Sequence, residues 1–214
     1  SFFAGENLPP PTITQFPTKK KPTESSAVSY TNFKGKTYYL HIGKTKTGKP
    51  RYTLKMSSDG DLLDKIPDGY EIYENPNAQV FLRKIPKKII TDDEVHIVEA
   101  GIKKYSKISH VKVDVKKDAI ILYAGHGLFP EMPDDLASRF GKISEEMKNK
   151  NILYAPEIRF VLFDKKARVF TPERYCYKGS IDDWIMIGTG DGDLKSLVKK
   201  YAQHLGQESF YELM

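Results

Sequence analysis

The chain has little cysteine and no long apolar run, and both absences narrow what the protein can be. Its 214 residues contain one cysteine, Cys176, which excludes an internal disulfide and a cysteine-based zinc site within one chain. No apolar stretch approaches the roughly 20 residues that a membrane-spanning helix needs. Charged residues make up 29% and hydrophobic residues 39% of the chain, a balance typical of globular proteins. We therefore expect a soluble, cytoplasmic protein that does not contact a membrane.

Acidic residues are scarce in the first quarter of the chain. Residues 1–58 hold ten lysines and arginines but only two acids, Glu6 and Glu24. The rest of the chain holds 24 basic and 26 acidic residues, so the formal net charge of +6 is concentrated near the N-terminus. A local excess of positive charge of this kind attracts polyanions.

Composition divides the chain into three segments. Residues 1–30 are rich in proline, serine and threonine, which favour extended backbone and predict an arm or a linker. Residues 31–88 predict a basic antiparallel β subdomain. Residues 89–214 predict an α+β domain, which either folds by itself or shares one core with residues 31–88.

Strand patterns occur in hairpins, and helical patterns are few. Two hairpins, 37–42 with 51–56 and 70–74 with 79–84, predict a four-stranded antiparallel unit. Thr91 and Glu94 form a capping box before a helix over 92–106. Further strands are expected at 111–115, 119–123, 158–163, 168–170, 174–177 and 184–187, and further helices at 134–150 and from Leu194 to Gly206. The predicted fold class is α+β, with antiparallel β-hairpins packed against two or three amphipathic helices and a Pro-rich N-terminal arm before them.

A glycine- and lysine-rich segment from Gly43 to Pro50 resembles a phosphate-binding loop only in part. Its spacing of two glycines and Lys49 fits the motif, but Pro50 stands where a serine or threonine would bind magnesium. The residues after it alternate like a strand, whereas a phosphate loop must open a helix. We therefore expect no nucleotide triphosphatase, and no cofactor or metal site.

The same hairpin, residues 36–56, combines basic and aromatic side chains without an acid among them. Lysines neutralise phosphates and exposed tyrosines stack on unpaired bases, which makes the hairpin a candidate nucleic-acid-binding site. The alternative is that the tyrosines face the core and the lysines only protect a solvated strand edge. The predicted binding residues are Lys36, Tyr39, Lys44, Lys46, Lys49, Arg51, Tyr52 and Lys55.

His126 is the one weak candidate for catalysis. It lies between Gly125 and Gly127 after an apolar strand, where a loop would present it to a substrate, with Tyr123 or Glu131 as a partner for proton transfer. The alternative is a glycine-rich turn in which His126 bonds to a backbone carbonyl.

Three hypotheses follow, in order of preference. The first is a non-enzymatic accessory protein that binds DNA or RNA through the hairpin at 36–56. The second is a protein-interaction module that docks on another chain through residues 1–30 and through its apolar C-terminal segment, residues 205–214. The third is an enzyme that uses His126.

Overall fold

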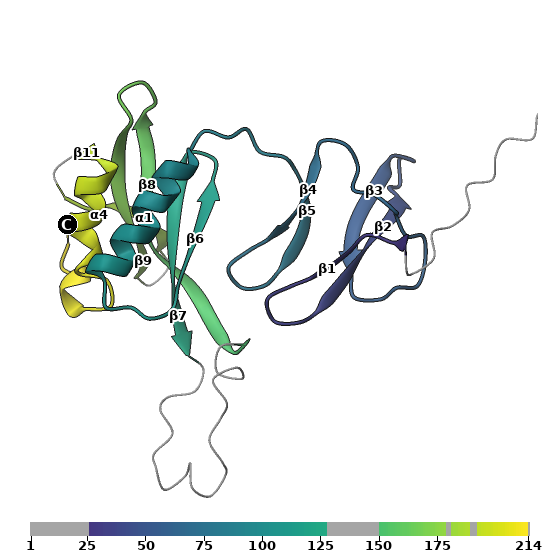
Figure 1. Cartoon of the computed structure of the whole chain (residues 1–214), viewed down its shortest axis with the longest axis horizontal. Coiled ribbons are helices and arrows are strands. Elements are labelled where there is room, and N and C mark those ends of the chain that lie inside the picture. The colour runs from purple at the N-terminus through teal and green to yellow at the C-terminus, as the bar shows by residue number, and fades with distance from the viewer. Residues whose placement is uncertain (1–25, 128–149, 179–180, 189–191, 214) are drawn as a thin grey trace, which may run out of the picture.

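The computed structural model describes residues 26–127, 150–178, 181–188 and 192–213, and within them the fold is α+β (Figure 1). All strand pairs are antiparallel, which confirms the predicted class. Most of the Pro-rich arm predicted at 1–30 and most of the helix expected at 134–150 lie outside these residues. No helix in the described part of the chain is long and apolar enough to cross a membrane.

The N-terminal part of the described chain forms two small sheets rather than one four-stranded unit. A three-stranded sheet has the order β1-β2-β3, and β4 and β5 form a hairpin of their own. Beyond β1, the backbone of residues 61–63 continues along β2, because Ile42 N–H donates to Asp61 and Leu63 N–H donates to Leu40. These strands are β1 (Ser29–Thr31), β2 (Thr37–Lys44), β3 (Pro50–Lys55), β4 (Tyr70–Glu74) and β5 (Val80–Lys84).

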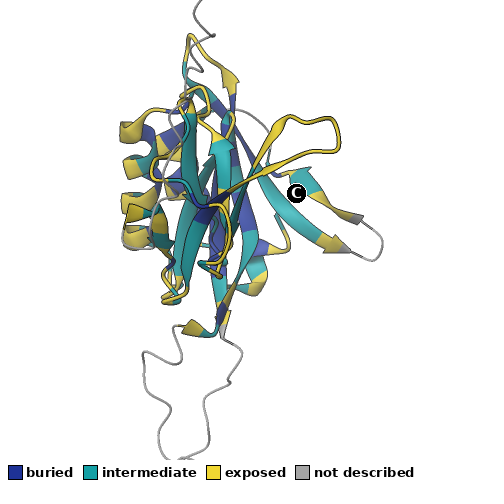
Figure 2. Ribbon diagram, turned by 90° about the vertical axis from the view of Figure 1, so that its right-hand side faces the viewer, coloured by how far each residue is buried: buried dark blue, intermediate teal, exposed yellow. Residues whose placement is uncertain are grey.

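The C-terminal part is built on a six-stranded sheet in which β10, β9, β8, β7 and β6 lie side by side and β11 pairs with β9. Two helices, α1 (Asp92–Tyr105) and α4 (Leu194–Ala202), pack on one face of it, and their outer surfaces are exposed (Figure 2). The strands are β6 (Val111–Lys116), β7 (Ala119–Gly127), β8 (Ile152–Asp164), β9 (Val169–Lys178), β10 (Ile181–Met186) and β11 (Gly192–Asp193). A short 3₁₀ helix, η2 (Glu208–Phe210), follows α4.

The main core lies between this sheet and the two helices. Alternation along β7 points Ile120 and Leu122 inward, where they meet Val98 of α1 and Tyr201 of α4. All four side chains are almost completely buried. The amphipathic pattern of the last helix is therefore confirmed, and Asp193 caps it by accepting a hydrogen bond from Ser196 N–H.

The two helices approach each other closely at one point, Gly101 of α1. A β-carbon at this position would lie 2.3 Å from Cγ1 of Val198 on α4, closer than any two carbon atoms can pack. With valine at position 198, only glycine at position 101 therefore allows this distance between the helices.

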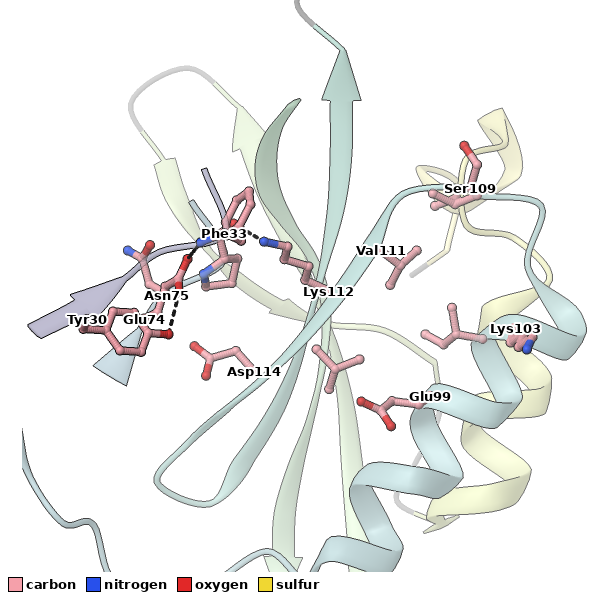
Figure 3. Close-up of a pocket in the computed structure, with 14 residues that line it drawn as sticks. Tyr30, Phe33, Glu74, Asn75, Glu99, Lys103, Ser109, Val111, Lys112 and Asp114 are labelled. Carbon is pink, nitrogen blue, oxygen red and sulfur yellow. Dashed lines mark hydrogen bonds between the residues drawn. The ribbon is translucent and has the colours of Figure 1, made fainter. Parts of the chain in front are cut away.

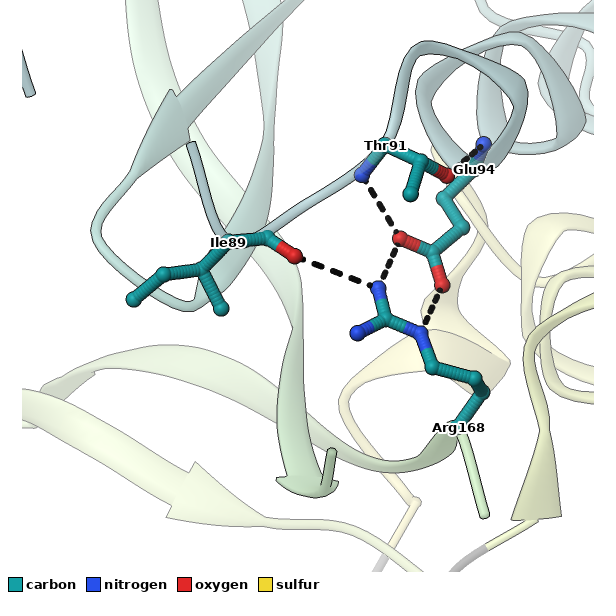
Figure 4. Close-up of polar contacts among 4 residues, drawn as sticks. All are labelled: Ile89, Thr91, Glu94 and Arg168. Carbon is teal, nitrogen blue, oxygen red and sulfur yellow. Dashed lines mark hydrogen bonds and ion pairs between the residues drawn. The ribbon is translucent and has the colours of Figure 1, made fainter. Parts of the chain in front are cut away.

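An ion pair fixes the start of α1 to the turn between β8 and β9 (Figure 4). The predicted capping box is present, with Thr91 Oγ1 accepting from Glu94 N–H at 3.3 Å and Glu94 Oε2 accepting from Thr91 N–H at 2.8 Å. Both carboxylate oxygens of Glu94 also accept hydrogen bonds from Arg168, Nε at 2.8 Å and Nη2. The same Nη2 donates to Ile89 O at 3.3 Å, so one guanidinium connects the linker, the helix and the sheet.

We predict that Glu94→Gln lowers the free energy of unfolding at pH 7 by about 1–2 kcal/mol, since glutamine preserves the capping box but not the charge paired with Arg168. Burial raises the pKa of Glu94, but the hydrogen bonds from Arg168 and Thr91 outweigh it and the net pKa is lowered. The wild-type advantage should therefore be present above about pH 4.5 and shrink as the pH falls through the lowered pKa.

Urea denaturation across this pH range measures both effects. Asp93→Asn is the matched control, because Asp93 lies in the same helical turn and is exposed. Equal losses in the two variants would contradict the role of the ion pair.

Candidate functional site

The tip of the β2–β3 hairpin is a closed turn and not a phosphate loop. Backbone donors at both ends of the turn bond within it: Thr45 N–H donates to Lys49 O at 2.8 Å, and Gly48 N–H donates to Thr45 O at 2.9 Å. Lys49 N–H donates to Thr45 Oγ1 at 3.1 Å. Strand β3 then starts at Pro50 in place of a helix. Since a phosphate loop binds through free backbone N–H groups, the partial motif has no such function here.

Four of the predicted binding residues gather at this tip, and we call them the basic tip: Lys44, Lys46, Lys49 and Arg51. Every residue from 42 to 51 is exposed. Within the part of the chain that the structure describes, none of the four forms an ion pair with a carboxylate. The basic tip is thus a group of four cations held close together by a tight turn, with their charge directed to solvent.

The other predicted residues lie away from the tip. Lys36 precedes β2 and Lys55 ends β3, so both are exposed at the far end of the hairpin. Eight strand residues at roughly 3.3 Å each put Lys36 about 25 Å from the tip, and Lys55, which is opposite Tyr39, lies about 15 Å from it. The structure therefore brings together four of the six predicted cations, and it leaves the other two at separate positions along the hairpin.

The two tyrosines predicted to stack on bases are half-buried and lie on opposite faces of the hairpin. Tyr52 is opposite Ile42 in the ladder, and its ring meets the Tyr70 ring edge-on, with 5.7 Å between centroids. Tyr39 is opposite Lys55 on the other face, beside His41, which is buried and hydrogen-bonded to Ser57 O. The tyrosines therefore support the hairpin, and their contact with bases stays a prediction.

A cavity of about 790 Å³ lies between the N-terminal sheets and the C-terminal domain (Figure 3). We call it the interface cavity. Segments from both parts line it: the turn after β1, the turn between β4 and β5, helix α1 and strand β6. Sequence patterns gave no sign of it, because its walls come from segments far apart in the chain.

Lys112 of β6 crosses the rim of this cavity (Figure 3). Its Nζ donates to Pro76 O at 3.1 Å and lies 3.0 Å from the centre of the Phe33 ring and 4.6 Å from that of Tyr154. Burial lowers the pKa of Lys112 to about 8, opposed by the charge of Glu74. The aromatic rings and the carbonyl together hold this ammonium group between the two parts of the chain.

The carboxylates of the interface cavity also join the two parts or brace one of them. Asp114 of β6 accepts a hydrogen bond from Tyr73 of β4. Glu74 accepts from Tyr30 Oη at 2.7 Å and from Phe33 N–H at 3.0 Å. Each of these two carboxylates is thus bonded within the fold, and their contacts make the cavity a joint between structural units.

His126 lies on strand β7 and not on a loop, which corrects the sequence-based expectation. Its side chain is 62% exposed, and Nε2 is 3.4 Å from Oε1 of the buried Glu157. Burial raises the pKa of Glu157, and the His126 charge opposes the rise. Tyr123 bonds to Lys116 instead, and Glu131 lies outside the described residues. His126 does not line the interface cavity, so a ligand bound in that cavity would not contact it.

The apolar C-terminal segment packs against the main core of the C-terminal domain. Phe210 is almost completely buried in the main core, and Leu213 packs against that core. Arg174 donates to the carbonyls of Tyr211 and Leu213, both at 3.3 Å, and so holds the chain end against β9. Residues 1–25, which include most of the predicted arm, lie outside the described residues.

Comparisons with known proteins do not assign a function. No protein-family model matches the chain, and neither curated proteins nor solved structures give a significant match. Among the described residues, no group of three histidine, cysteine, aspartate or glutamate side chains is placed to hold a metal ion. A functional proposal therefore rests on the geometry of the chain itself.

We predict that the Cε resonance of Lys112 titrates with a midpoint near pH 8. Two-dimensional NMR of a protein with ¹³C-labelled lysine measures this, and Lys112→Met identifies the signal by its loss. Phe33→Leu, which removes an aromatic face that favours the charged form, should lower the midpoint further. A midpoint near 10.5 in the wild type would show that Lys112 is not buried in the joint.

Proposed function

We propose that the protein binds nucleic acid and that the basic tip is its phosphate-contacting element. The observation that carries this proposal is the exposure of four cations in one tight turn without a carboxylate partner among the described residues. Lysines paired with acids would have to lose those partners before binding a phosphate. Unpaired lysines lose only counterions, and the release of counterions from the polyanion favours association.

The shape of the hairpin supports the same function. A two-stranded ribbon with a narrow, charged tip fits into a groove of a duplex or along the backbone of a single strand. Its cations are mainly lysines, which act as point charges and contact phosphates without reading base edges. We therefore infer binding that depends little on sequence, through phosphates of either DNA or RNA.

The charge reversal Lys44→Glu, Lys46→Glu, Lys49→Glu and Arg51→Glu should weaken binding of a labelled DNA duplex about tenfold or more at low salt. The reason is that each replacement removes a phosphate contact and adds repulsion. Fluorescence anisotropy of the labelled DNA measures the dissociation constant.

The matched control reverses four exposed lysines elsewhere, Lys165, Lys166, Lys195 and Lys199. It changes the net charge equally, so it separates the effect of the tip from that of total charge. Equal weakening by both variants would contradict a specific role for the tip, and so would full affinity of the tip variant.

Salt dependence gives a second, independent prediction. If four phosphates are neutralised by the tip, the slope of log K against log salt concentration should differ by about 3 to 4 between the wild type and the tip variant on duplex DNA. Titrations at several salt concentrations measure the two slopes. Identical slopes would show that the tip does not contact phosphates.

A further inference from the structure

The face of the six-stranded sheet that α1 and α4 leave uncovered carries a second cavity. The register places Lys116 opposite Ala119 and Tyr175 opposite Trp184 on this face, because directly paired residues point to the same side. The buried side chains here, Ala119, Ile121 and Tyr123, form a cluster separate from the main core. The face is therefore an apolar surface of its own, and neither of the two helices in the described ranges covers it.

The cavity measures about 490 Å³ and we call it the sheet-face cavity. Its floor consists of small and branched apolar side chains, and its walls are aromatic and basic. This volume is enough for one planar ring system with its substituents. The lining residues are Lys116, Lys117, Asp118, Ala119, Ile121, Tyr123, Pro156, Arg159, Val161, Tyr175 and Trp184.

One wall is a layered arrangement of planar groups. The guanidinium carbon of Arg159 lies 4.5 Å from the centre of the Trp184 ring, and Tyr175 meets that ring edge-on, with 5.0 Å between centroids. Glu173 accepts a hydrogen bond from Arg159 Nε at 2.5 Å and so fixes the guanidinium plane. Planar guanidinium and aromatic groups at a cavity wall are what a nucleobase stacks on.

The charged side chains that line the cavity favour an anionic ligand. Two lysines, Lys116 and Lys117, line it against one acid, Asp118, while the charge of Arg159 is paired with Glu173. Lys116 Nζ lies 3.1 Å from Tyr123 Oη, at the end of the cavity opposite the Arg159–Trp184 wall in the sheet order. An occupant with a flat apolar body and a negative group therefore matches both the aromatic wall and the two lysines, whereas an apolar peptide would add no negative charge beside those lysines.

We propose that the sheet-face cavity binds an unpaired base of a single-stranded nucleic acid, with the base against Arg159, Trp184 and Tyr175 and the adjoining phosphate near Lys116 and Lys117. This deepens the proposed function and rests on it, because the basic tip supplies the general attraction to the polymer. A duplex keeps its bases stacked inside, so only a single strand, a loop or an end can present a base to this cavity.

The single tryptophan of the chain makes this proposal directly testable, because all tryptophan fluorescence comes from Trp184. Full-length protein is titrated with single-stranded oligothymidylate, and Trp184 fluorescence is recorded beside the anisotropy of a label on the same strand. We expect saturable quenching by the single strand. A duplex of equal length should bind through the tip and leave the fluorescence unchanged.

Variants separate the two surfaces. Arg159→Lys keeps the charge but removes the planar group, and it should raise the dissociation constant for the single strand about tenfold. Lys116→Gln with Lys117→Gln, at the exposed end of β6 and in the turn after it, should weaken the same complex several-fold without changing Arg159, Trp184 or Tyr175. The fourfold charge reversal of the basic tip should weaken binding but leave the full quenching at saturation.

The outcomes distinguish failure of this inference from failure of the proposed function. A single strand that binds by anisotropy without any change in Trp184 fluorescence overturns the base site and leaves the role of the tip standing. Absence of binding by both readouts overturns both. Quenching by free thymidine monophosphate at the same affinity would overturn the assignment to a polymer, since the cavity would then be a small-molecule site.

Discussion

The orientation of α1 on the sheet of the C-terminal domain depends on the carboxylate of Glu94. It closes the capping box with Thr91 and receives the guanidinium of Arg168 from a turn 74 residues later in the chain. Because a helix start and a sheet turn share one acid, the direction of α1 over the sheet is set at its first residues. Val98 and Ile102 then come to lie on Ile120 and Leu122, and the core closes around them.

The two parts of the chain meet through a different kind of contact. Lys112, Tyr73 with Asp114, and Asn77 with Tyr154 form a polar and cation–π joint, in which Asn77 both donates to and accepts from the Tyr154 backbone. Polar joints of this type fix orientation through geometry more than through buried apolar area. The basic tip lies on a hairpin whose other end packs against β5 and Tyr70, while the tip itself is exposed in the part of the chain that the structure describes.

Sequence patterns predicted the local structure well and the long-range contacts poorly. The capping box, both N-terminal hairpins and the stripe of the last helix depend on neighbours in the chain, and each is present. The pairing of the two hairpins into one sheet was wrong, and so was the loop around His126, since register with β8 extends β7 through Ala124–Gly127. The position of Trp184, half-buried on the outer face of the sheet, could not be predicted, because alternation within one strand does not show which face the helices cover. Lys112 and Arg159 carried no local signal at all.

The close approach of α1 and α4 at Gly101 has a consequence for how this fold can change over evolutionary time. The space that a side chain at 101 would occupy is already filled by Val198, so the two positions share one volume. In related sequences they should therefore vary as a pair: alanine or serine at 101 is compatible with this helix spacing where position 198 has become smaller. Larger side chains at both positions would require α4 to move away from α1. Tyr201 would move with it, and its hydroxyl donates to Ile187 O just after β10.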